Sequence, residues 1–84
     1  MHYTNRRFWE YYNALPEDVQ RNADRCYELL KTDPSHPSLH FKKVGKYWSV
    51  RAGRDYRALG IEVEKGILWF WIGTHAEYDK LTSK

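Results

Sequence analysis

Two arginines on either side of a short turn are the first residues of this 84-residue chain that could do chemistry. Arg51 precedes the sequence AGRD and Arg57 follows it, so an antiparallel hairpin would bring both guanidinium groups to one end of a sheet. Converging arginines bind phosphate well, because each presents a planar pair of N–H donors to the oxygens. The alternative is that both arginines extend from a core strand and pair with Asp55 and Glu62.

A histidine and a tyrosine follow the last apolar run, in the sequence GTHAEYD at residues 73–79. Imidazole changes its protonation near neutral pH, so His75 beside an arginine could act as a general acid or base. Tyr78 comes three residues later and would lie beside His75 in one helical turn. A lone histidine is more often a solvated surface residue, and the residues alone leave both interpretations open.

The chain offers no good nucleophile of its own. Cys26 falls in an apolar helical stripe, where a buried structural thiol is expected, and no serine lies in a nucleophile-elbow sequence. The five glycines are scattered and form no phosphate-binding loop, and one cysteine without a paired ligand motif indicates neither a metal nor another cofactor. An enzyme of this composition would need a substrate with its own nucleophile, as RNA has in its ribose 2′-hydroxyl.

Positive charge is concentrated in one segment. Residues 36–66 carry seven basic and three acidic side chains, whereas residues 1–35 have a net charge of −1 and residues 67–84 of zero. A basic segment suits a polyanionic partner, although a solvated basic surface is an equal alternative. Besides the two arginines above, the segment contains Lys42, Lys43, Lys46 and Arg54.

The first third of the chain is predicted to be helical. Thr4 or Asn5 can cap a helix through RRFWEYYNAL, residues 6–15, and a second helix with Pro16 in its first turn runs on to Pro34. Apolar residues in the second helix recur at helical spacing, which predicts packing on another layer. The two helices form an αα hairpin.

From residue 39 onward the period becomes that of strands. LHFKKV, YWSVRA, YRALGIEVE and ILWFWIG are separated by short Gly-containing turns, which predicts an antiparallel meander. The last strand is apolar on both faces, with Leu68, Phe70 and Ile72 predicted to point one way. Ile67, Trp69 and Trp71 are predicted to point the other way.

These elements predict one α+β domain over residues 1–84, with the αα hairpin packed on one face of a four- to five-stranded, mainly antiparallel sheet. A single cysteine excludes an internal disulfide and favours the reducing cytoplasm. No run of about 18 apolar residues is present, so no membrane association is expected.

The sequences HPSLHFKKVGKYWSVRAGRDYRALG and WFWIGTHAEYD, in this order of elements, resemble the RelE/ParE superfamily of bacterial toxins. The resemblance implies a toxin of a toxin–antitoxin module, with a protein antitoxin as partner and a metal-independent endoribonuclease activity on mRNA, free or on the ribosome. It implies that Arg51 is the cation on the hairpin strand, that Arg57 binds the phosphate, that His75 transfers protons and that Tyr78 stacks on or hydrogen-bonds to RNA. It places Lys42, Lys43, Lys46 and Arg54 on the RNA- or ribosome-facing rim.

The sequence also departs from RelE. Ser49 stands where a lysine is expected, and Tyr78 falls short of the terminal tyrosine position, so the resemblance favours a mechanism centred on His75. Two other functions remain open within the superfamily. One is a ParE-like toxin that binds DNA gyrase, and the other is an inactive toxin-like protein that only binds an antitoxin.

Overall fold

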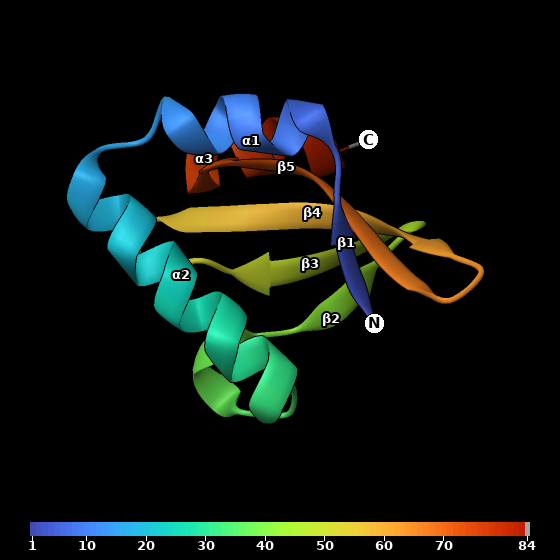
Figure 1. The fold of residues 1–84 in the computed structure, drawn as a ribbon. Coiled ribbons are helices and arrows are strands. Elements are labelled where there is room, and N and C mark those ends of the chain that lie inside the picture. The colour runs from blue at the N-terminus through green and yellow to red at the C-terminus, as the bar shows by residue number, and fades with distance from the viewer. Residues whose placement is uncertain (84) are drawn as a thin grey trace.

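The computed structural model describes residues 1–83, in which three α-helices accompany a five-stranded mixed sheet. The elements follow in the order β1 (His2–Thr4), α1 (Arg6–Asn13), α2 (Glu17–Thr32), the 3-10 helix η1 (Pro37–Leu39), β2 (Lys42–Val44), β3 (Tyr47–Arg51), β4 (Tyr56–Val63), β5 (Gly66–Thr74) and α3 (His75–Thr82). The strands lie in the order β1-β5-β4-β3-β2 (Figure 1). The predicted α+β class is confirmed.

Both predicted N-terminal helices are present. Of the two candidate caps, Asn5 is the one used, because its side chain accepts a hydrogen bond from the Phe8 amide at 2.9 Å. Pro16 stands at the cap position of α2, just before the helix, and two acidic residues follow in the first turn. The helix ends before Pro34, as predicted.

The antiparallel meander of β2 to β5 is confirmed, and the sheet has the larger of the two predicted strand numbers because a short N-terminal strand, which no sequence pattern had indicated, joins it. Strand β1 pairs in parallel with β5, with His2 opposite Ile67 and Thr4 opposite Trp69. The predicted strand from residue 39 is also shorter than expected. His40 has a φ of 48°, which is incompatible with a strand, and Leu39 is fully buried at the end of η1 instead.

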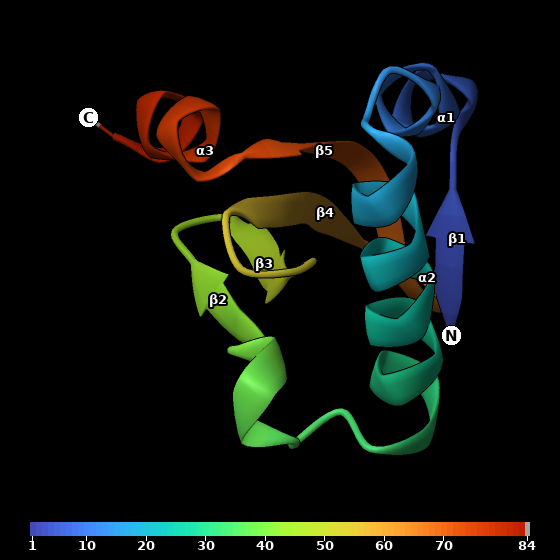
Figure 2. The same ribbon diagram turned by 90° about the vertical axis from the view of Figure 1, so that its left-hand side faces the viewer.

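The sheet is covered on both faces. Figure 2 shows α2 on one side of the sheet and α3 on the other, with α1 lying along β5. The larger apolar cluster lies between the first two helices and the sheet; it contains Ala23, Leu30, Leu39, Val50, Ala52, Ala58, Trp69 and Ile72. The smaller cluster, formed by Leu59, Trp71 and Tyr78, lies on the α3 side. The predicted packing of the αα hairpin therefore holds for one face, and α3 is an additional element on the other.

A β-bulge in β5 contradicts the predicted faces of that strand. Leu59 pairs with Trp71 and Gly60 with Trp69, so Phe70 is an extra residue without a partner on β4. The phase of the side chains changes there, and Trp69 belongs to the larger cluster whereas Trp71 belongs to the smaller. The prediction that these two tryptophans share a face was wrong, because strict alternation does not survive a bulge.

The described part of the chain, residues 1–83, contains no helix that is both long and apolar enough to cross a membrane.

Candidate active site

Arg57, His75 and Tyr78 come together where β5 passes into α3. Arg57 lies opposite Gly73 in the register of β4 and β5, two residues before His75. The other two side chains both lie against the Tyr78 ring. Its centroid is 5.8 Å from the Arg57 guanidinium carbon and 5.7 Å from the His75 ring centroid. The structure thus places a permanent cation and an imidazole against one aromatic ring.

The start of α3 is fixed by three contacts. The Thr74 hydroxyl accepts from the Glu77 amide at 3.2 Å, and the Glu77 carboxylate accepts from the Thr74 amide at 3.1 Å, which is a complete capping box. The His75 amide donates to the Asp55 carbonyl at 2.8 Å and so ties the helix to the β3–β4 turn. The backbone of His75 is therefore held against the hairpin that carries the two arginines.

The His75 side chain is half exposed, at 48%, and contacts Asp79 one turn later in α3. The distance between His75 Nδ1 and Asp79 Oδ2 is 3.2 Å. Arg57 is also partly accessible, so both groups can reach a ligand that arrives from solvent. Their arrangement suits proton transfer beside a phosphate group.

Tyr78 is buried, with 8% exposure, and packs with Leu59 and Trp71. Arg57 and His75 already lie against its ring. The ring consequently serves as a platform for those two side chains and has little free surface for stacking on a base.

Arg51 lies directly opposite Arg57 in the β3–β4 register, as the hairpin predicted. Its side chain has its own contacts, because Nε donates to the Gly53 carbonyl at 3.3 Å. Its charge also acts on the thiol of Cys26 in α2. Burial raises the pKa of Cys26, while the charges of Arg25 and Arg51 act in the opposite direction. The two arginines therefore start from the same face of the sheet, but the Arg51 side chain bends to the Gly53 carbonyl and lines the cavity beside α2.

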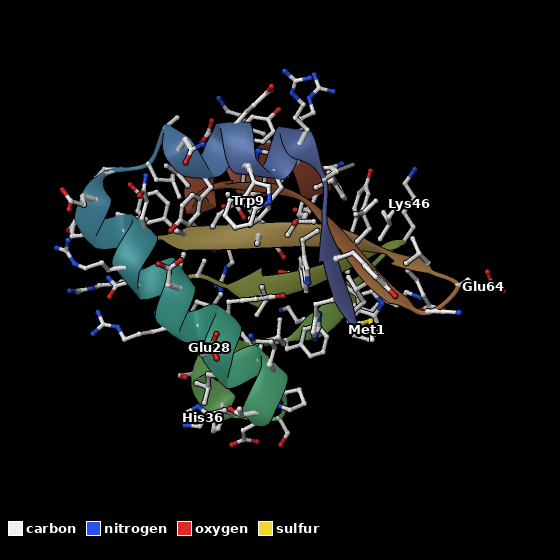
Figure 3. All side chains as sticks on the ribbon, in the orientation of Figure 1. Met1, Trp9, Glu28, His36, Lys46 and Glu64 are labelled. Atoms are coloured by element: carbon white, nitrogen blue, oxygen red, sulfur yellow. The ribbon has the colours of Figure 1, made fainter. Side chains whose placement is uncertain are left out.

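The basic side chains of residues 42–54 do not share one face. Lys42 lies opposite Ser49, in the row that also contains Leu59 and Trp71, and so points to the α3 side. Lys46 packs its ammonium 5.4 Å from the Tyr47 ring, at the end of the sheet remote from α3 (Figure 3).

Two other predicted members of this rim lie elsewhere. The Nζ atom of Lys43 is 3.5 Å from Glu62 Oε1 and 5.6 Å from the centroid of the Trp48 ring. Trp48 packs on the larger apolar cluster, beneath α1 and α2. Lys43 therefore extends from the face opposite Arg57. Arg54 is exposed in the β3–β4 turn.

Comparison with known proteins assigns the chain to a family. Residues 17–80 match the model of the ParE-like toxin domain. The chain belongs to this family. No curated protein matches it significantly.

Solved structures agree with the fold of this toxin domain. The RelB–RelE antitoxin–toxin complex from Methanococcus jannaschii matches with a TM-score of 0.71 at 13% identity, over 94% of this chain and 96% of that one. The archaeal RelE–RelB complex from Pyrococcus horikoshii OT3 matches with a TM-score of 0.62 at 18% identity, over 88% and 92%. The isolated E. coli RelE toxin matches with a TM-score of 0.61 at 10% identity, over 96% of both chains. The resemblance to RelE/ParE superfamily toxins is confirmed.

Asp79 and the capping box are features of the candidate site that sequence reasoning missed. Thr74 and Glu77 have the spacing of a capping box, and this signal predicts a helix from residue 75. Once that helix is recognised, Asp79 falls four residues after His75, on the same helical face. The pattern was present in the sequence but was interpreted only as a bend with a single helical turn.

The opposite face of the toxin contains an apolar cavity of about 130 Å³ between α1, α2 and the sheet. It has few groups for chemistry. Cys26 lines it with a raised pKa, and the Tyr12 hydroxyl at its edge donates to Asp24 at 2.7 Å. Burial and this carboxylate raise the pKa of Tyr12 to about 12, so neither group ionises near neutral pH. Within residues 1–83, no group of three or more His, Cys, Asp or Glu side chains is arranged to hold a metal ion.

Proposed function

We propose that this toxin is an mRNA endoribonuclease that uses the ribose 2′-hydroxyl as its nucleophile. The observation that carries the proposal is the placement of Arg57 and His75, both accessible, against the ring of the buried Tyr78. A cation and a proton acceptor held at one place are what this reaction requires of an enzyme without a metal. A protein that only binds another protein has no need of this pair.

In the proposed reaction, His75 Nε2 takes the proton of the 2′-hydroxyl and the 2′-oxygen attacks the adjacent phosphorus. The bond to the 5′-oxygen breaks, the leaving oxygen takes a proton from water, and His75 returns its proton to the resulting hydroxide. The guanidinium of Arg57 stabilises the negative charge of the phosphorane, because its planar N–H groups match the phosphate oxygens. The products are a 2′,3′-cyclic phosphate and a 5′-hydroxyl end. Arg51, whose side chain bends toward α2, adds a more distant positive charge from the neighbouring strand.

The mRNA is proposed to lie along the α3 side of the sheet, either free or on the ribosome. Arg51 and Arg57 form one cross-strand pair, and Lys42 lies two residues along the strands from this pair, about 7 Å at 3.4 Å per residue. Tyr47, on which Lys46 packs, lies four residues from the same pair, or about 14 Å. Both lysines can therefore contact phosphates on one side of the cleaved bond. Lys43 and Arg54 extend from other surfaces and would contact the ribosome or more distant phosphates.

The partner of the toxin is proposed to be a protein antitoxin. Two of its structural relatives are solved as complexes of RelE with RelB. Together with a target in mRNA, this partner implies that the toxin acts in the cytoplasm, as one domain over residues 1–84.

The test is the His75→Ala variant, purified and compared with the wild type on RNA and on ribosomes carrying mRNA. Loss of the general base should lower the cleavage rate by about 10²- to 10⁴-fold. His36→Ala is the matched control, because this histidine lies beside η1 at the far end of the molecule (Figure 3). Equal activity of the wild type and the His75→Ala variant would contradict the proposal.

A second candidate is a toxin that binds DNA gyrase, the function that the resemblance to ParE implies; the family model of a ParE-like toxin domain is consistent with it. That function predicts growth arrest with DNA breaks while mRNA remains intact. Expression of the toxin without an antitoxin, followed by mapping of RNA ends and of DNA breaks, separates the two. Normal growth would instead identify a protein that only binds an antitoxin.

A further inference from the structure

We infer that Asp79 is a positioning residue for His75, which fixes the orientation and the tautomer of the imidazole. The inference rests on the proposed function, in which His75 is the general base. It concerns a residue that neither the arginine pair nor the family relationship points to.

The two side chains are held together by the geometry of α3. They are four residues apart on one face of the helix, and His75 Nδ1 lies 3.2 Å from Asp79 Oδ2. Their side chains are 48% and 62% exposed, so the pair contributes little to stability. The pair instead orients the imidazole of His75. The carboxylate holds one edge of the imidazole, and the Tyr78 ring lies beside it, with 5.7 Å between the two ring centroids.

The carboxylate also determines which ring nitrogen carries the proton. An ionised carboxylate only accepts hydrogen bonds, so a neutral His75 in contact with Asp79 carries its proton on Nδ1. Nε2 is then unprotonated, and it points away from Asp79 across the ring. This is the nitrogen that takes the 2′-hydroxyl proton in the proposed reaction.

The other charged groups around His75 are engaged elsewhere. The Glu77 carboxylate accepts from the amide and the hydroxyl of Thr74 at 3.1 and 3.0 Å. Arg57 lies against the ring of Tyr78. Within the described residues, Asp79 is thus the carboxylate in contact with the imidazole.

The first test measures the tautomer directly, through the ¹⁵N chemical shifts of the imidazole of the intact toxin at a pH where His75 is neutral. The wild type should show His75 protonated on Nδ1. The Asp79→Asn variant should show a shift toward the Nε2-protonated form, because the amide can donate to Nδ1. Glu10→Gln is the matched control, since Glu10 forms an i,i+4 pair with Arg6 on another helix.

The second test is kinetic, with the RNA substrate used for the proposed function. The Asp79→Asn variant should lose at least about tenfold in kcat with an unchanged KM, because the imidazole has to change tautomer before it can accept a proton. Asp79→Glu should recover most of the rate, since it keeps a carboxylate at the same position.

The outcomes separate the inference from the proposed function. A wild type protonated on Nε2, or an active wild type with an equally active Asp79→Asn variant, would overturn the role of Asp79. A wild type that does not cleave RNA would refute the proposed function, and the nitrogen shifts alone would then decide whether Asp79 sets the tautomer.

Discussion

Arg51 and Arg57 lie opposite each other on neighbouring strands, yet their side chains contact different groups, so their alanine variants should differ. Arg57 lies over the Tyr78 ring beside His75, whereas Arg51 donates to the Gly53 carbonyl. Arg57→Ala removes the cation expected to stabilise the phosphorane, a loss of about 10²- to 10³-fold in kcat. Arg51→Ala should lose about tenfold or less, because its guanidinium extends toward α2.

The expected loss of activity exceeds any loss of stability. The contact of Arg57 with the Tyr78 ring is a cation–π interaction at a partly exposed site, worth about 0.5–1 kcal/mol. A loss of 10²- to 10³-fold in rate corresponds to about 2.7–4 kcal/mol of transition-state stabilisation. Since small domains are stable by about 5–15 kcal/mol, the Arg57→Ala variant should remain folded.

The assay is single-turnover cleavage of an RNA or of mRNA on the ribosome, with the melting temperature of each variant as the control for folding. Arg57→Lys should fall between the wild type and Arg57→Ala, because an ammonium keeps the charge but loses the planar pair of donors. If Arg51→Ala loses as much activity as Arg57→Ala, the two arginines act as one clamp and the distinction drawn from their contacts is wrong.

Two further predictions concern stability. Gly60→Ala should lower the free energy of unfolding by about 1–3 kcal/mol, because a Cβ atom would lie 2.7 Å from Ile67 Cγ2 and 2.9 Å from Trp69 Cε3. Urea unfolding measures this loss. An unchanged free energy of unfolding would mean that the sheet is not packed as described. Stability should also fall as the pH falls below 6.5, because burial and the adjacent N-terminal ammonium lower the pKa of His2, and the unfolded chain therefore takes up the proton first. Thermal melts at several pH values should show a smaller decrease in melting temperature with falling pH for His2→Asn than for the wild type. Equal decreases would exclude His2 as the cause.

The sequence predicted the elements that carry their own local signals. The helix cap at Asn5, the acidic first turn of α2 and the turns of the meander depend on residues close to one another in the chain, and they are found where expected. The opposition of Arg51 and Arg57 follows from the hairpin and was predictable for the same reason.

The features that were missed depend on distant parts of the chain. Strand β1 has three residues and is defined by its pairing with β5, more than sixty residues later, so local periodicity contains no sign of it. The bulge at Phe70 lies in a strand that is apolar on both faces, where a change of phase leaves the pattern unaltered. The direction of the Arg51 side chain depends on its hydrogen bond to the Gly53 carbonyl, which no strand pattern specifies.

The bulge connects the core to the site. It turns Trp71 to the α3 side, where Trp71 packs with Leu59 and Tyr78. Tyr78 is therefore a core residue of α3 and at the same time the ring against which Arg57 and His75 lie. Because a side chain packed in a core has one conformation, the packing of the smaller cluster sets the position of the ring against which the cation and the imidazole lie. Substitutions at Leu59 or Trp71 would thus change the geometry of the site without touching either functional group.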